Sequence, residues 1–350
     1  MIVKVILFNL LLSITFIFAI ELGVRILFPN IFCVGIDKNF FEYKKFGDTY
    51  GFKKNIKGVI FGKEFITGDL GFPINPKSTL TNQAKHTILV LGDSISFALG
   101  VEANNAFPFL LERRLKKGYR IINASISGYG VEDYYNILKD LLPRMDFEGI
   151  IISLSINDFT ALSQTFIIKN FNRQLQRKRI IQNPFLRSII YVNNYFFDFN
   201  AFLREHSKAY MLIRRLFLDS SKIYFLAEKE TFEHADIKNY ISDSLLKINN
   251  LAVKNGKWII FFVLPYKEQL RQDAKSDDFK PQARINEVAS EEFLSVVDCC
   301  PLLKKFIESS GVKLNTLYLS PEDGIHFSLL GHKVISEIIT DELSHRGLAQ

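Results

Sequence analysis

The longest apolar run of the chain lies near its N-terminus. Residues 5–20 are almost entirely apolar, and the apolar pattern resumes over residues 22–28. A helix needs about 20 such residues to cross a bilayer. Val3 to Phe28 is therefore long enough to span, provided that Glu21 and Arg25 lie near an interface or pair one turn apart. The pattern predicts a single membrane-spanning helix.

The flanks of this segment bear on its processing and its orientation. No small-residue cleavage site follows Ile20, which favours a retained anchor over a cleaved signal peptide. Lys4 precedes the apolar run over residues 5–20. More basic residues follow that run: Arg25, Lys38, Lys44 and Lys45. The positive-inside rule therefore does not support an outward-facing domain.

Beyond residue 85, short apolar runs alternate with helical patterns. The runs that predict strands cover 87–91, 120–124, 149–154, 258–264 and 293–297. Apolar residues at helical spacing predict helices over 107–117, 131–142, 237–255 and 329–343. Such alternation is typical of β-α-β units, and it predicts an α/β fold with a doubly wound parallel sheet.

The remaining segments divide the chain into regions. Residues 31–84 are rich in glycine and aromatic residues, and they predict short strands or hairpins at 50–52, 58–61 and 71–72. We therefore expect an anchor over 1–30, a β-containing stem over 31–84 and a main domain over 85–350. That domain carries a helical insertion at about 160–235, where the alternation breaks.

The insertion is basic and aromatic. Six of its basic residues occur with no acidic residue between them: Lys169, Arg173, Arg177, Lys178, Arg179 and Arg187. Aromatic residues are interleaved with them: Phe166, Phe171, Phe185, Tyr191 and Tyr195. One interpretation is a solvated basic face. The other is a cap that contacts an anionic membrane surface or an anionic glycan.

Composition narrows the choice of partners. The 350 residues are 48% hydrophobic, which is enough for a sizeable core. The net charge is +7, but no zinc-finger, helix-turn-helix or RNA-binding motif accompanies it, so we predict no nucleic-acid partner.

Cys299 and Cys300 are adjacent and Cys33 lacks a lipobox, so neither a disulfide framework nor a lipid anchor is expected. No zinc-ligand spacing appears, and we predict neither a metal nor a cofactor.

Candidate chemistry follows the first strand of the predicted sheet. Ser94 stands directly after the strand over 87–91, and open parallel sheets place their functional groups beyond the carboxyl ends of the strands. A serine hydroxyl becomes a good nucleophile when a base takes its proton and a third group orients that base. Asp323 and His326 are spaced so that a loop can bring the carboxylate onto the imidazole.

Four short blocks together resemble the SGNH/GDSL hydrolase family. They are Gly92-Asp93-Ser94, Asn123 to Gly128, Ser155-Ile156-Asn157-Asp158 and Asp323 to His326. The resemblance implies a flavodoxin-like fold. It also implies that Ser94 is the nucleophile of a triad with Asp323 and His326.

The same resemblance implies an oxyanion hole. Its donors are the backbone amides of Ser94 and Gly128 and the side chain of Asn157. Ser155 departs from the family pattern, in which the third block usually begins with glycine. The α/β-hydrolases share the order Ser, Asp, His, but their elbow requires Gly-x-Ser-x-Gly, and Ser96 stands at the last position here. We interpret His206 and His332 as structural.

These observations predict a membrane-anchored serine esterase or deacylase. Its expected substrate is an ester, such as an acylated carbohydrate of the cell envelope or an exported polymer. Relatives that are anchored in bacterial membranes imply an extracytoplasmic domain. Two alternatives stay open: an O-acyltransferase, because a sugar hydroxyl can resolve the same acyl-enzyme, and a non-catalytic scaffold that retains the fold.

Overall fold

A five-stranded parallel sheet organises the computed structural model. The structure describes residues 2–29, 31, 33, 37–75, 85–115, 118–160, 182–217, 219–320 and 323–348. The strands of the sheet are β5 (His86–Leu91), β6 (Tyr119–Asn123), β7 (Gly149–Leu154), β8 (Trp258–Val263) and β9 (Val296–Asp298). Their spatial order is β6-β5-β7-β8-β9, which is the flavodoxin-like order of a doubly wound sheet. The predicted fold class is confirmed.

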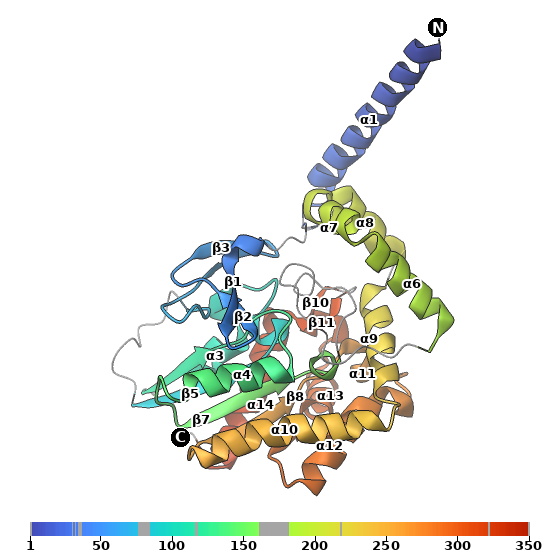
Figure 1. Cartoon of the computed structure of the whole chain (residues 1–350). Coiled ribbons are helices and arrows are strands. Elements are labelled where there is room, and N and C mark those ends of the chain that lie inside the picture. Colours follow the sequence, from blue (N-terminus) through green and yellow to red (C-terminus); the bar gives the residue numbers. More distant parts are fainter. Residues whose placement is uncertain are drawn as a thin grey trace.

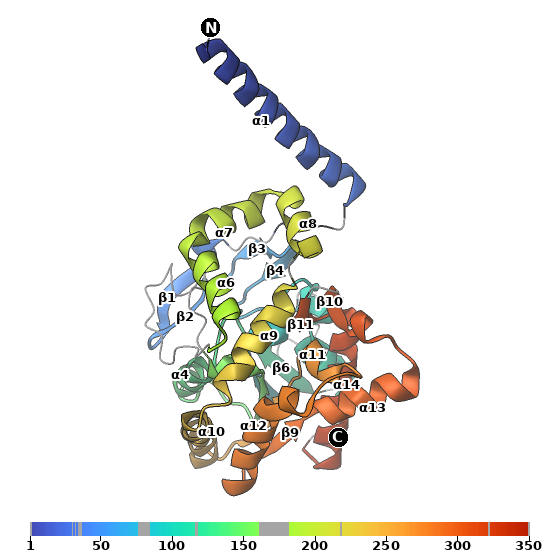
Figure 2. The ribbon, with the colours of Figure 1, turned by 90° about the vertical axis from the view of Figure 1, so that its right-hand side faces the viewer.

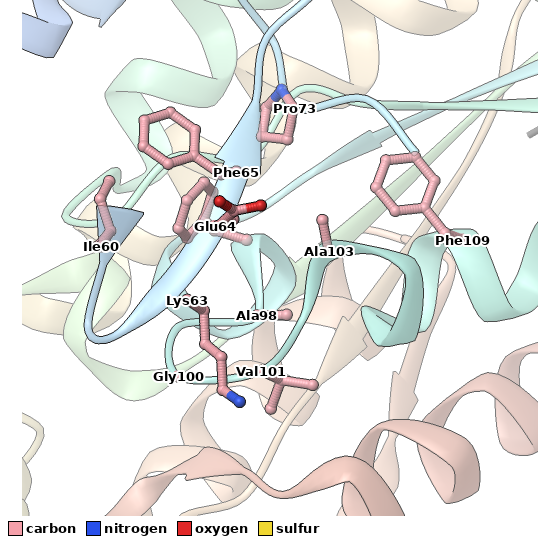
Figure 3. A pocket seen from close by; sticks show the side chains of 11 residues that line it. Ile60, Lys63, Glu64, Phe65, Pro73, Ala98, Gly100, Val101, Ala103 and Phe109 are labelled. Atoms are coloured by element: carbon pink, nitrogen blue, oxygen red, sulfur yellow. The ribbon is translucent and has the colours of Figure 1, made fainter. Parts of the chain in front are cut away.

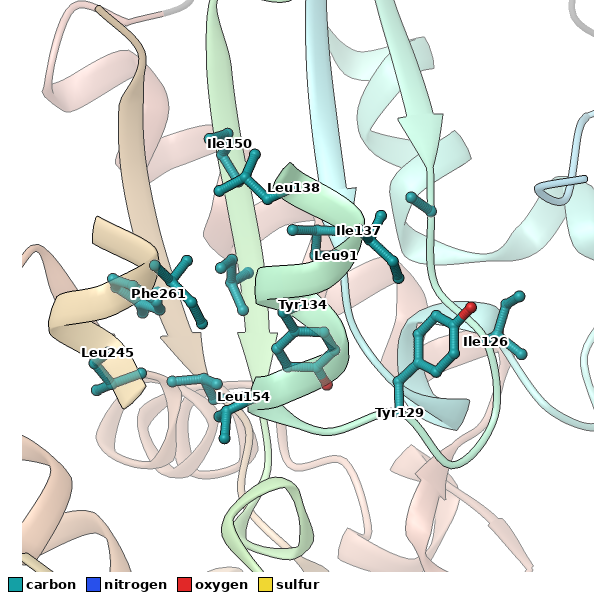
Figure 4. Close-up of a cluster of buried hydrophobic side chains, with 14 of the residues drawn as sticks. Leu91, Ile126, Tyr129, Tyr134, Ile137, Leu138, Ile150, Leu154, Leu245 and Phe261 are labelled. Atoms are coloured by element: carbon teal, nitrogen blue, oxygen red, sulfur yellow. The ribbon is translucent and has the colours of Figure 1, made fainter. Parts of the chain in front are cut away.

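Helices cover both faces of this sheet (Figure 1). One face packs against α4 (Val131–Leu141), α10 (Asp236–Lys254) and α12 (Lys280–Glu291). The other packs against α3 (Phe107–Arg114), α13 (Cys299–Ser310) and α14 (Leu329–His345). Successive residues of a strand point to opposite faces, so Leu89 joins the first cluster and Val90 the second. Figure 4 shows the first cluster, with Ile137 and Leu138 of α4 and Leu245 of α10 among its apolar side chains.

Three expectations from the sequence need correction. β9 begins at Val296 and not at residue 293, because Phe293 has a left-handed backbone (φ 53°) and an exposed side chain. Residues 71–72 form a bend and no strand. Asp323 to His326 lie in a strand and not in a loop. This strand, β11 (Asp323–Phe327), pairs antiparallel with β10 (Tyr318–Ser320).

Two hairpins between residues 41 and 66 pack onto the main domain. They are β1 (Phe41–Phe46) with β2 (Thr49–Phe52), and β3 (Lys57–Ile60) with β4 (Lys63–Ile66). The hydroxyl of Tyr50 donates to the carbonyl of Ser127 at 2.6 Å, and the hydroxyl of Tyr129 donates back to the carbonyl of Tyr50 at 2.6 Å. The hairpins therefore support the loop that follows β6.

The N-terminal helix α1 (Ile2–Leu27) projects away from the rest of the chain (Figures 1 and 2). Among the described residues it is the one helix long and apolar enough to cross a membrane. α6 (Pro184–Tyr195), α7 (Phe197–His206) and α8 (Lys208–Phe217) follow later in the chain, and α9 (Ser220–Thr231) packs against β11.

Short elements complete the described chain. They are α2 (Ser94–Phe97), α11 (Lys267–Leu270) and 3-10 helices at Lys38–Phe40, Ala103–Asn105, Ile156–Phe159, Ser276–Phe279 and Leu314–Leu317. Several basic and aromatic residues of the insertion lie outside the described residues: Lys169, Arg173, Arg177, Lys178, Arg179, Phe166 and Phe171. Arg187, Phe185, Tyr191 and Tyr195 lie on α6.

Candidate active site

Ser94 is held at the carboxyl edge of the sheet by its neighbours in the chain. β5 ends at Leu91, and Ser94 is the first residue of α2. The Asp93 carboxylate caps this short helix by accepting from the Ile95 amide at 2.8 Å. Gly92 is required for close packing, because a Cβ there would lie 2.3 Å from the hydroxyl oxygens of Ser96 and Ser153. The glycine of this block thus lets neighbouring side chains approach the backbone.

The structure brings Ser94, His326 and Asp323 together. Ser94 Oγ lies 2.9 Å from Nε2 of His326, and Nδ1 of His326 lies 2.8 Å from Oδ2 of Asp323. The other carboxylate oxygen of Asp323 accepts from the amides of Ile325 and His326 at 3.1 and 3.0 Å. One carboxylate therefore fixes both the backbone of β11 and the orientation of the imidazole.

Opposite charges determine the titration of this pair. Burial alone would lower the pKa of His326, but the Asp323 carboxylate raises that pKa above its ordinary value of 6.5. Burial acts to raise the pKa of Asp323, and the charge and hydrogen bonds of His326 outweigh it, so the Asp323 pKa is lowered. The pair therefore favours a carboxylate facing an imidazole that gains a proton readily.

The side-chain amide of Asn157 has three partners. Its Nδ2 donates to Oδ2 of Asp93 at 3.1 Å, and its Oδ1 accepts from the hydroxyl of Tyr266 at 2.9 Å. The hydroxyl of Ser155 also donates a hydrogen bond to Oδ1. The two hydroxyl donors fix the oxygen end of the amide and leave its nitrogen on the side of Asp93, the neighbour of Ser94.

Ser155 shows why this block tolerates a residue other than glycine. Its φ and ψ are −129° and 166°, an extended conformation that any residue adopts. Its hydroxyl, which glycine lacks, contacts Asn157 and lies 3.4 Å from Oδ2 of Asp93. The departure from the family pattern therefore adds a hydrogen bond near Asn157 without straining the loop.

Gly128 lies in the loop after β6. β6 is the direct neighbour of β5, so this loop emerges at the same edge of the sheet as Ser94. The residue is exposed and has φ 86°, a left-handed conformation that favours glycine. The contact between Tyr50 and the adjacent Ser127 supports the loop from outside the sheet.

Sequence reasoning missed two supporting residues. Tyr266 follows β8 and reaches Asn157, which is 109 positions earlier in the chain. Ser221, on α9 at the end of the insertion, accepts from the amide of Gly324 at 3.0 Å. A Cβ on Gly324 would lie 2.5 Å from this hydroxyl and 2.8 Å from Cβ of Lys267. No local pattern indicates either contact, because each depends on elements that only the fold brings together.

Two other buried titratable groups near the site, His332 and Asp158, accept hydrogen bonds from backbone amides. Nδ1 of His332 accepts from the Phe107 amide at 3.3 Å, and burial lowers the His332 pKa to about 3, with a further contribution from His326. Asp158 accepts from the Ser155 amide at 2.9 Å, and burial together with Asp93 raises its pKa well above the ordinary value. His332 is therefore neutral at physiological pH, which suits a structural residue.

A small pocket lies between β4 and the segment that follows α2 (Figure 3). Phe65, Phe97 and Phe109 contribute aromatic side chains to its lining, and Lys63 and Glu64 contribute charged ones. Its free space is about 10 Å³, enough for roughly one water molecule. It is too small for an acyl chain, and none of Ser94, Asp323 and His326 lines it.

Comparisons with known proteins give one local sequence match and several distant structural ones. No protein-family model matches the chain. Esterase TesA of Pseudomonas aeruginosa is 51% identical over 83 residues, which is 23% of this chain and 41% of that protein. The match thus spans about two fifths of the length of this curated relative.

The solved structures are less similar in sequence. A lipolytic G-D-S-L family protein from Veillonella parvula is 11% identical with a TM-score of 0.42, over 74% of this chain and 98% of its own. Est24, a carbohydrate acetylesterase from Sinorhizobium meliloti, is 12% identical with a TM-score of 0.40, over 75% of this chain and 99% of its own. Because these TM-scores are below 0.5, the fold assignment depends on the strand order described above. In its four sequence blocks and its local match to Esterase TesA, the chain resembles the SGNH/GDSL hydrolases.

Proposed function

We propose that the chain is a serine hydrolase acting on carboxylic esters. The observation that carries this proposal is the continuous hydrogen-bonded series from Ser94 through His326 to Asp323. Ser94 Oγ attacks the ester carbonyl while Nε2 of His326 takes its proton, and Asp323 stabilises the imidazolium that forms. His326 then protonates the leaving alcohol. An acyl-enzyme remains, and water, activated by the same imidazole, hydrolyses it.

An oxyanion hole completes the proposed mechanism. Negative charge on the carbonyl oxygen is stabilised by the amides of Ser94 and Gly128 and by the side chain of Asn157. An amide nitrogen carries two hydrogens. Asn157 can therefore keep its bond to Asp93 and direct the second hydrogen to the oxyanion.

A fluorophosphonate probe tests the proposal directly. We expect the detergent-solubilised full chain to form one covalent adduct on Ser94, located by peptide mass spectrometry, because the probe reacts with activated serines. Ser94→Ala should not react, whereas Ser96→Ala, which alters a nearby buried serine, should still do so. An adduct at another serine, or no adduct on the folded wild-type chain, would contradict the proposal and favour the scaffold interpretation.

The same proposal includes a location. α1 is exposed over residues 2–20, and an 18-residue stretch of it has a mean hydropathy of 2.4, as expected for a retained anchor. An ester of an envelope or exported carbohydrate is the substrate class that an outward-facing domain can reach.

We expect the chain to stay with membranes after a high-salt wash and to keep its N-terminal residues. In cells with a permeabilised outer barrier and an intact inner membrane, added protease should digest the domain. A cytoplasmic protein serves as the control for membrane integrity. Protection of the domain until the inner membrane is lysed would contradict the outward orientation and leave the chemistry of Ser94 untouched.

A further inference from the structure

The helices α6 to α8 expose an unusual concentration of apolar side chains. Beyond residue 28, seventeen large apolar side chains are exposed among the described residues, and ten of them lie between 185 and 217. The others are scattered over the rest of the surface. A concentrated apolar patch on an otherwise polar surface marks a contact site. We refer to α6, α7 and α8 as the platform helices.

The exposed side chains have helical spacing. Val192, Tyr195, Phe199 and Phe202 are three or four residues apart along α6 and α7, and Ile213, Leu216 and Phe217 are likewise spaced on α8. Residues at this spacing share one face of a helix. Tyr195 is 74% exposed and Phe217 is 79% exposed, so these faces are open. Each platform helix thus has an apolar stripe.

The end of α1 is fixed on these helices. The Glu21 carboxylate accepts from the amides of Lys208 and Ala209, each at 3.0 Å, and from the hydroxyl of Ser207 at 2.8 Å. Glu21 therefore caps the N-terminus of α8. Arg25 pairs with Glu21 at 2.7 Å and donates to the carbonyl of His206 at 2.8 Å. Figures 1 and 2 show α8 beside the end of α1 that is nearest to the rest of the chain, and α7 adjoins α8.

We propose that the platform helices lie in the interfacial layer of the bilayer that α1 crosses, with their apolar stripes among the lipid chains. A helix that leaves a membrane brings whatever is docked on its end to the membrane surface. Residues 182–217 carry five basic and two acidic residues, which favours anionic lipid headgroups. This inference depends on the proposed role of α1 as an anchor.

The platform also connects the bilayer to the candidate active site. Phe217 ends α8, and Ser221, four positions later, is hydrogen-bonded to Gly324 of β11. The strand that carries Asp323 and His326 is therefore supported by the segment that leaves the membrane surface. It follows that the site is held close to the bilayer and serves esters that are presented there.

Tryptophan fluorescence in vesicles tests the docking. The chain has one native tryptophan, Trp258, whose signal is measured in the unsubstituted chain and subtracted. Phe199→Trp and Leu216→Trp report on the platform, and Phe293→Trp, at a side chain that is 95% exposed beyond α12, is the matched control. The full-length variants are reconstituted into phosphatidylcholine and phosphatidylglycerol vesicles, with and without brominated acyl chains.

We expect brominated lipid to reduce the platform signals by about twofold and to leave the control unchanged, because only buried reporters contact acyl chains. Aqueous iodide should quench the exposed control more strongly than the platform reporters. Platform signals quenched by iodide as strongly as the control would overturn the docking. Shielding of the platform from both quenchers would also overturn it, since a protein partner would then cover the stripes. If α1 is not an anchor, the chain will not float with the vesicles, which distinguishes that failure from the others.

Discussion

The Asp323→Asn variant is expected to hydrolyse a small aryl acetate about 10⁴-fold more slowly than the wild-type chain at neutral pH. Asn has nearly the same shape, and its Oδ1 can still accept from the amides of Ile325 and His326, so β11 keeps its local hydrogen bonds. Its NH2 group, however, would face Nδ1 of His326 and stabilise the tautomer that carries its proton on Nε2. That nitrogen could then no longer accept the proton of Ser94.

The pH profile distinguishes this electrostatic role from a structural one. The free enzyme needs neutral His326, so kcat/KM should fall as the pH drops through the His326 pKa. Asp323 raises that pKa above 6.5, and the wild-type acid limb should therefore lie above pH 6.5. In Asp323→Asn the charge and hydrogen bond by which Asp323 raises the His326 pKa are lost, while burial still lowers it and Asp93 still raises it, so the midpoint should move to lower pH. An unchanged midpoint would contradict the electrostatic role of Asp323. An Asp323→Asn chain that no longer folds, as judged by circular dichroism, would show that Asp323 has a structural role instead.

The sheet could be predicted from the sequence because its signals are local. Continuous apolar runs such as 149–154 are typical of strands buried on both faces, and this run coincides with β7. The β10–β11 hairpin was missed because its strands are short, and Asp323 and His326 are polar residues on one of them. The strand predicted from Phe293 was placed too early for the opposite reason. Phe293 is apolar, but it lies in an exposed left-handed turn.

The residues of the candidate site likewise fall into those that the sequence identifies and those that only the fold reveals. Ser94, Asn157, Asp323 and His326 could be named because each belongs to a short block with a chemical meaning. Tyr266 could not, because it lies in no such block and its hydroxyl matters only through its contact with Asn157.

The second large effect on turnover is expected when Asn157, the side-chain donor of the proposed oxyanion hole, is removed. Asn157→Ala should lower kcat for a small aryl acetate by about 100-fold or more and change KM little, because the missing hydrogen bond forms chiefly in the transition state. Stability should change less than activity, because Asn157 is only partly buried. Thermal unfolding of the same variant checks this. A collapse of the melting temperature would show that Asn157 is a structural residue.

Tyr266→Phe refines the test, because it removes the hydroxyl that holds Oδ1 of Asn157 and keeps the ring that packs beside Phe225. We expect kcat to fall by about tenfold at nearly constant KM, less than in Asn157→Ala, because Ser155 still contacts the same oxygen. In the Asn157→Ala background, Tyr266→Phe should have almost no further effect, since the group that it orients is gone. Independent, multiplicative losses in the double variant would show that Tyr266 acts on catalysis by a route other than the orientation of Asn157.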